Sequence, residues 1–271
     1  MYQRIEQTLA AQPKKALYYV LIFVAICLAL LWGSSSMHFH GFTEAGLKVA
    51  RGVINGIFHP NWSLIFDLGE NGIPYLILQT IAIAILGTII GAILAIPFSF
   101  LASSMIFPKP IPYIFRAIIL LIRTIPALIW ALVWIRVTGP GPFCGVITQA
   151  ICSIGMISKM YITAIEDIDT GILEALDAIG CTTFQKIKVG ILPQLSASFI
   201  STAIYRFDIN LKDATILGIV GAGGIGSPLS QSISNSRWDA VGAFLLSLIL
   251  LVILIEYCST KIRSRLAHGK K

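Results

Sequence analysis

The chain has 271 residues, of which 56% are hydrophobic and only 12% are charged. Soluble domains contain about 45–50% apolar and about 25% charged residues, so this composition excludes an ordinary water-soluble domain and indicates a membrane protein. The formal net charge is +7, but the sequence contains no soluble domain that would present a basic face, and we therefore expect no nucleic-acid partner.

Six segments are apolar enough to cross a membrane, because a spanning helix requires about 20 mostly apolar residues. In chain order they are Ala16–Trp32, Ile73–Phe107, Ala117–Ile135, Val137–Ser158, Gln194–Leu211 and Ala240–Ile255. The second carries no charge and is longer than one crossing requires, whereas the fifth carries Arg206 and Asp208. We therefore predict an all-α, polytopic membrane protein with about six transmembrane helices.

The basic residues predict the orientation of these spans. With the N-terminus in the cytoplasm, the inner residues are Arg4, Lys14, Lys15, Lys109, Arg116, Lys159, Lys186, Lys188, Lys261, Arg263, Arg265, Lys270 and Lys271, and the outer ones are Lys48, Arg51, Arg136 and Arg237. This excess on the inside follows the positive-inside rule, so both termini are predicted to be cytoplasmic. No A-x-A cleavage pattern follows the first span, which favours a retained helix over a signal peptide.

Residues 33–72 form the longest outer segment. Within it, Phe42–Phe58 has apolar residues at helical spacing, which predicts a short helix at the membrane surface that acts as a structural flap. We divide the chain accordingly. Residues 1–72 contain the N-terminal tail, the first transmembrane helix and the outer segment, residues 73–258 form a transmembrane core, and residues 259–271 form a basic cytoplasmic tail.

The polar segment 166–193, between the fourth and fifth spans, predicts a cytoplasmic hairpin of two short helices. Asp169 or Thr170 can cap the first helix, and Gly180 stands where a left-handed residue commonly ends one. Thr182 begins a capping box with Gln185, and the proline at the end of the segment can begin the next span. The first helix has an apolar face that requires a hydrophobic partner, formed by Ile172, Leu173, Leu176 and Ile179.

Charged residues within the spans are the candidates for a translocation path or gate, because a charge at membrane depth normally faces a bundle interior or an aqueous cavity. Arg123, in the third span, either lines the path or is a structural arginine. A polar cluster at the end of the fifth span contains Arg206, Asp208, Asn210, Lys212 and Asp213. Helical spacing places the first, third and fifth of these on one face and makes Asp208 and Lys212 an i,i+4 pair, which favours a structural network, with a gate as the alternative.

Gly221, Gly223 and Gly226 have the G-x-G-x-x-G spacing of a dinucleotide-binding loop. Such a loop follows a strand and is followed by an acidic residue about 20 positions later. Here the next acidic residue is Asp239, and another span follows. We therefore predict that these three glycines, together with Gly224, form a tight turn or re-entrant segment near the outer part of the path, where spans pack closely.

A resemblance to a known family rests first on the hairpin. The residues that carry it are Glu174, Ala175, Leu176, Gly180, Leu192 and Pro193, which are similar to the EAA loop of ABC-importer permeases. The family pattern is E-A-A-x-x-x-G, then nine variable residues and I-x-L-P. The chain departs from it at Leu176, in place of the second alanine, and at Gly190, in place of the isoleucine. The resemblance implies that these six residues form the helix that docks in a groove of an ATPase subunit.

A narrower resemblance covers roughly residues 73–255. The runs IRTIPALIWALVW, GPGPFCGVI, ITAIEDID, EALDAIG and YRFDINLKDATILGIVGAGGIG resemble the permease subunit of phosphonate importers, a family with phosphite-type relatives. Ala127 and Lys212 depart from the family, which has a glutamate and an arginine there, and both departures bear on the choice of substrate. A type I ABC-importer permease fold is implied, and a cationic Arg123 would suit an anionic phosphonate.

The family also implies partners: a second copy of this permease, two ATPase subunits, an extracytoplasmic substrate-binding protein and membrane lipid. The sequence has no G-x-x-x-x-G-K-[ST] loop, so we predict that the chain is not itself an enzyme, that it holds no cofactor, and that ATP and Mg²⁺ bind to the partner ATPases. The predicted location is the cytoplasmic membrane of a prokaryote. Two alternatives remain open: a permease of the methionine or glycine betaine type, and an ATP-independent secondary transporter, which would not explain the EAA-like loop.

Overall fold

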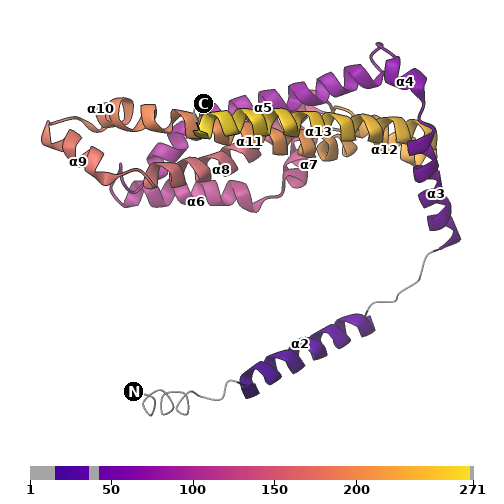
Figure 1. The fold of residues 1–271 in the computed structure, drawn as a ribbon, viewed down its shortest axis with the longest axis horizontal. Coiled ribbons are helices and arrows are strands. Elements are labelled where there is room, and N and C mark those ends of the chain that lie inside the picture. Colours follow the sequence, from indigo (N-terminus) through magenta and orange to yellow (C-terminus); the bar gives the residue numbers. More distant parts are fainter. Residues whose placement is uncertain (1–15, 37–42, 269–271) are drawn as a thin grey trace. The chain divides into compact units, whose positions relative to one another are not determined.

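The structure is a computed structural model that describes residues 16–36 and 43–268, and within these ranges every regular element is a helix (Figure 1). The all-α prediction is confirmed. The chain divides into two units, residues 1–48 and 49–271. In the first unit, α2 (Ala16–Ser36) covers the predicted first span, and its large side chains are exposed, as expected of a helix that is apolar all round and surrounded by lipid. Some of the basic residues that predict the orientation lie outside the described residues: Arg4, Lys14, Lys15, Lys270 and Lys271.

The second unit is a helical bundle. Its long helices are α5 (Ile73–Ala102), α8 (Pro142–Glu166), α11 (Leu192–Ile219) and α13 (Trp238–His268). The shorter elements are α4 (Trp62–Phe66), α6 (Pro110–Thr124), α7 (Ala127–Thr138), α9 (Thr170–Ala178), α10 (Thr183–Gln185), the π-helix η1 (Lys186–Ile191) and α12 (Gly226–Ser234). Among the described residues of both units, five helices are long and apolar enough to cross a membrane, or six when α6 and α7 count as one bent span.

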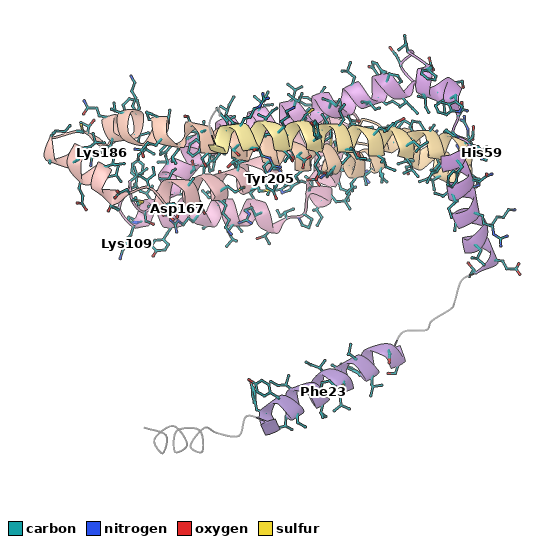
Figure 2. All side chains as sticks on the ribbon, viewed as in Figure 1. Phe23, His59, Lys109, Asp167, Lys186 and Tyr205 are labelled. Atoms are coloured by element: carbon teal, nitrogen blue, oxygen red, sulfur yellow. The ribbon has the colours of Figure 1, made fainter. Side chains whose placement is uncertain are left out.

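Two residues of the predicted inner set and one of the predicted outer segment lie at opposite ends of the bundle. Lys109 and Lys186, together with Asp167, lie at the end that also holds α9 and α10, whereas His59 lies at the opposite end (Figure 2). The orientation of the spans in the membrane stays a prediction.

The helix predicted at Phe42–Phe58 is present as α3 (Glu44–Phe58). Its second half packs on the start of α13, where a side chain at Gly52 or Gly56 would overlap Trp238. Asn61 follows α3, caps α4 and donates a hydrogen bond of 2.8 Å from its side chain to the Asp239 carboxylate. The segment from 49 to 66 is thus anchored on α13.

The predicted third span, 117–135, is not one straight helix. α6 ends at Thr124 and α7 begins at Ala127, and the two are bent by 86°. The break falls at Pro126, which has no N–H to donate to the carbonyl of Ile122, one turn earlier. The indole N–H of Trp130 reaches that carbonyl instead, at 3.4 Å. The proline therefore fixes the break, and an aromatic side chain satisfies the freed acceptor.

The limits of four other predicted spans require correction. α5 ends at Ala102 rather than 107, because the chain turns at Ser103 towards the two prolines 108 and 110. α8 covers 142–166 rather than 137–158, because glycines with positive φ separate it from α7. α11 extends to Ile219 rather than 211, since its charged residues find partners on neighbouring helices, and α13 continues to His268 through much of the predicted basic tail.

The core of the second unit lies where α5, α8 and α11 pack against one another. Small residues allow this contact: a side chain at Gly91 of α5 would meet Ser153 of α8. Towards the α9–α10 end, Tyr161 stacks on Phe199 of α11 with ring centroids 3.9 Å apart and donates a hydrogen bond of 3.1 Å to its backbone carbonyl. These contacts place α11 in a fixed register against α8.

Candidate functional site

The hairpin between α8 and α11 forms as its caps predict. The Asp169 carboxylate accepts a hydrogen bond from the Gly171 N–H at 2.9 Å, and Thr182 and Gln185 form a reciprocal capping box. Gly180 has φ +77°. Its N–H donates to the carbonyl of Asp177, and the next N–H, that of Cys181, donates to Leu176 at 3.0 Å, which is the pattern of a Schellman motif. The predicted helix–glycine–helix unit is confirmed.

The second arm of the hairpin continues directly into the fifth span, which the sequence did not predict. After α10 the chain enters the π-helix η1 and then α11 without a break, so that 183–219 form one helical rod of 37 residues. Pro193 stands in the first turn of α11, as predicted. Because proline has no N–H, the preceding turn loses an α-helical donor, and the N–H of Leu192 bonds five residues back to Ile187.

The two departures from the EAA pattern lie against each other. A Cβ atom on Gly190 would lie 2.5 Å from Cδ1 of Leu176. The larger residue on α9 thus occupies the space that the missing side chain leaves on η1, and Gly190 is buried beneath it. An ion pair between Asp177 and Lys186 also joins the arms. The hairpin is a packed unit that compensates internally for both departures.

The outer surface of the hairpin is exposed and partly apolar. Ile172, Leu173 and Leu176 of the predicted apolar face are half-buried against their own chain, whereas the fourth residue, Ile179, is 74% exposed. Phe184 is 72% exposed, and Glu174, Ala175, Leu192 and Pro193 are also exposed. Such a group of large exposed apolar side chains at one end of a bundle is typical of a protein–protein contact.

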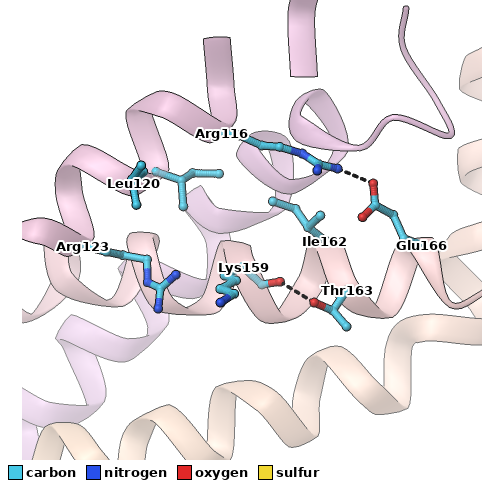
Figure 3. Close-up of a pocket in the computed structure, with 8 residues that line it drawn as sticks. Arg116, Leu120, Arg123, Lys159, Ile162, Thr163 and Glu166 are labelled. Atoms are coloured by element: carbon cyan, nitrogen blue, oxygen red, sulfur yellow. Dashed lines mark hydrogen bonds and ion pairs between the residues drawn. The ribbon is translucent and has the colours of Figure 1, made fainter. Parts of the chain in front are cut away.

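Arg123 lies on the last turn of α6 beside a pocket between α6 and α8 (Figure 3). The pocket has a volume of about 350 Å³, and Arg116, Lys159 and Glu166 also line it. Arg116 forms an ion pair with Glu166. Lys159 was predicted to lie beyond the fourth span, but α8 continues for two turns past it. This unforeseen length of α8 brings Lys159 to the same pocket as Arg123.

The polar cluster of α11 lies in the middle of the helix rather than at its end, because α11 continues to Ile219. Arg206 and Asn210 are buried and share a face, as predicted. Arg206 pairs with Asp213 at 3.6 Å and donates to the Ser153 hydroxyl at 3.2 Å. The Asn210 amide donates to Ser153 and to Thr88 of α5, both at 2.8 Å. These bonds tie α11 to both neighbouring helices.

The other face of α11 carries the predicted i,i+4 pair. Lys212 lies 3.4 Å from the Asp208 carboxylate and 3.3 Å from that of Glu256 on α13. A lysine ammonium can serve two carboxylates at once as a point charge. The structural pairing predicted for this cluster is therefore present; the alternative role as a gate stays a prediction.

The glycine stretch forms a tight turn between α11 and α12, as predicted. Gly221, Gly223 and Gly224 have φ values of +100°, +83° and +73°. The side chains of Gln79 and Thr80 on α5 accept hydrogen bonds from the N–H groups of Gly224 and Ile225, at 2.8 and 3.0 Å. A helix rather than a strand precedes the turn, so it lacks the context of a dinucleotide loop. Its place in the transport path stays a prediction.

Sequence reasoning missed the partners of these candidates. Thr88, Gln149 and Ser153 complete the buried network, and Gln79 and Thr80 hold the glycine turn. Gln149 and Ser153 are spaced i,i+4 within an apolar helix, a pattern that indicates polar contacts between membrane helices. That spacing was visible in the sequence, whereas the helices that these residues face were not.

Comparison with known proteins places the chain among transport proteins. The family "Binding-protein-dependent transport system inner membrane component" matches residues 87–267. The chain is 40% identical to the phosphate-import permease protein PhnE of Mycolicibacterium smegmatis, over 69% of this chain but only 36% of that longer protein. HtxC of Stutzerimonas stutzeri, named as a candidate phosphite transport system permease, is 30% identical over 100% of this chain and 96% of its own.

Solved structures agree on the fold. A chain of the inward-facing MetNI methionine ABC transporter superposes with a TM-score of 0.62 at 23% identity, over 72% of this chain and 95% of that chain. At this identity the likeness concerns the arrangement of helices alone. The arrangement of helices in the bundle is thus one that a solved ABC transporter chain also has.

Proposed function

Since the chain belongs to the family of inner membrane components of binding-protein-dependent transport systems, and is a permease subunit of an ABC importer, we propose that it carries a phosphorus oxyanion of the phosphonate, phosphite or phosphate class across the cytoplasmic membrane. The substrate class is supported by the relatives, which are named for phosphate and phosphite transport. The observation that supports coupling of transport to ATP hydrolysis is the hairpin. It exposes apolar side chains at one end of the bundle and continues into a membrane helix.

The partners follow from this architecture. Two separate ATPase subunits bind and hydrolyse ATP with Mg²⁺, and each docks on one hairpin through the exposed residues Ile179 and Phe184 and the EAA-like positions 174–176. A second copy of this permease completes the path, and an extracytoplasmic binding protein delivers the anion to the outer mouth. Both termini lie in the cytoplasm, in agreement with the basic residues at the hairpin end of the bundle.

The chain's own residues transmit movement from the ATPase to the path. A displacement of the hairpin moves α11 with it, because 183–219 form one rod. Arg206 and Asn210 hold this rod in register with α8 and α5, so these helices shift together or exchange hydrogen-bond partners. At the far end of α11, the glycine turn provides the backbone freedom at which α11 can rotate against α12.

Uptake by a reconstituted complex tests this function. The permease is placed in vesicles together with an ATPase and a binding protein encoded beside it, and uptake of phosphonate, phosphite and phosphate is compared with that of methionine and glycine betaine. We expect uptake of a phosphorus oxyanion that requires ATP and the binding protein. Uptake by the permease alone without ATP would instead identify a secondary transporter, and uptake of only methionine or betaine would reassign the substrate.

A further inference from the structure

The pocket between α6 and α8 carries an excess of positive charge. Three basic side chains, Arg116, Arg123 and Lys159, face it together with a single carboxylate, that of Glu166. Arg116 is fully engaged: it pairs with Glu166 and donates hydrogen bonds to the Ala102 carbonyl at 2.9 Å and to the Ser104 hydroxyl at 3.1 Å. Its charge is therefore offset, and the surplus resides on the other two cations.

Arg123 and Lys159 form no ion pair with any residue that the structure describes. Figure 3 shows both at one end of the pocket, with the Arg116–Glu166 pair at the other. Arg123 is seven residues beyond Arg116 on α6, and Lys159 is seven before Glu166 on α8, so both lie about 10 Å further from the hairpin end of the bundle than that pair. Both side chains are exposed at the pocket, so an anion from the surroundings can reach the two cations.

The backbone makes room for this arrangement. A side chain at Gly155 of α8 would lie 2.7 Å from Cγ of Arg123, so the stem of the arginine lies directly on the helix at the glycine. This contact restricts the directions in which the guanidinium can turn and holds it beside Lys159, one turn further along α8. The stem of Arg123 is thus packed on α8 at the wall of the pocket, while the residue as a whole stays exposed.

We propose that Arg123 and Lys159 form an oxyanion site in the permease itself, which takes the phosphate- or phosphonate-type group of a small molecule. A guanidinium presents two parallel N–H donors to such a group, and an ammonium adds a point charge. The other lining residues are the apolar Ile119, Leu120 and Ile162 and the polar Thr163, whose hydroxyl donates a hydrogen bond of 3.2 Å to the Lys159 carbonyl. With a volume of about 350 Å³, the pocket also has room for an organic substituent on the phosphorus.

The same chemistry has two sources, the transported anion and the headgroup of an anionic phospholipid from the inner leaflet. The identification of the occupant as the transported anion rests on the proposed function. The existence of the anion site itself does not depend on that function. The two sources differ in one respect that can be controlled, because a nanodisc can be prepared from neutral phosphatidylcholine with or without phosphatidylglycerol.

The test measures binding to the full permease–ATPase complex in these nanodiscs, without the binding protein. The probes are radiolabelled methylphosphonate and inorganic phosphate, and bound phosphatidylglycerol is counted by native mass spectrometry. We expect saturable probe binding, or one retained lipid, that weakens at least about tenfold in Arg123→Gln and in Lys159→Gln. Arg136→Gln in α7 and Lys109→Gln before α6 are the matched controls, since both are exposed cations outside the pocket.

Each outcome bears on the proposal. Probe binding in neutral nanodiscs that the two pocket variants weaken assigns the site to the free anion, and loss of a bound lipid in the same variants assigns it to a headgroup. Equal binding of probe and lipid by wild type and the Arg123→Gln/Lys159→Gln double variant overturns the site. ATP-driven uptake measured alongside separates the two hypotheses: unchanged uptake with an absent site rejects only the site, whereas binding without any phosphorus oxyanion uptake rejects only the proposed function.

Discussion

Leu176 and Gly190 illustrate how two single residues define the shape of the hairpin. Each differs from the EAA pattern, and taken alone each would seem to weaken the resemblance, but the leucine side chain fills the space above the glycine. The pair shows that the two positions depend on each other's volume. A contact of this kind predicts that the effects of substituting them are not additive.

Replacing Gly190 with alanine should destabilise the hairpin by at most about 1 kcal/mol, because the new methyl group meets only the flexible end of the Leu176 side chain, which turns aside. Leu176→Ala should also destabilise it, through a lost apolar contact. The double variant should be more stable than the sum of the two losses predicts, since the alanine at 176 leaves room for the one at 190. Thermal unfolding of the purified permease measures all three, and strictly additive shifts of the melting temperature would contradict the contact.

At the scale of elements, the α11 rod links the hairpin to the buried polar network. A π-helical turn at 186–191 forms part of the rod. A flexible insertion at this turn would separate the hairpin from the membrane span. The α6–α7 pair behaves in the opposite way, because Pro126 breaks it and allows a bend of 86°. One span is therefore a continuous rod, and another is bent at a proline.

Insertion of two glycines between Gln185 and Lys186 should uncouple ATP hydrolysis from transport. The hairpin surface would still bind the ATPase, but its displacement would no longer reach Arg206 and Asn210 through a continuous helix. We expect ATPase binding and basal hydrolysis to persist while uptake falls at least about tenfold, on the premise that flexible glycine linkers transmit little displacement. The same insertion between Gly69 and Glu70, in an exposed turn, is the control and should leave uptake intact. Normal uptake in the first variant would rule out the rod as the mechanical link.

At the scale of the whole molecule, the apolar runs predicted an all-α membrane protein and its membrane-spanning helices, and the capping residues predicted the hairpin. These features depend on local composition and spacing. Span limits were less accurate, since they depend on tertiary contacts: α11 passes through polar and charged residues whose partners lie on α5, α8 and α13. The pocket was missed for the same reason, because no spacing in the sequence relates Lys159 of α8 to Arg123 on another helix.

The glycine turn connects α11 to α12 and contacts α5 and α8. Substitutions in it can distinguish the effect of backbone strain from the effect of a packing clash. Gly223 and Gly139 both have φ +83°, so alanine is strained at either position, and Gly139, with ψ 167°, has a conformation that is almost confined to glycine. At Gly223 the added methyl would also lie 2.8 Å from Cα of Pro142, whereas at Gly139 nothing lies within 4 Å. Gly223→Ala should therefore lower the uptake rate well below that of Gly139→Ala, because only Gly223→Ala disturbs the contact between the turn and α8. Equal effects of the two variants, measured in the same vesicles, would show that the close approach of α8 to the turn is not required.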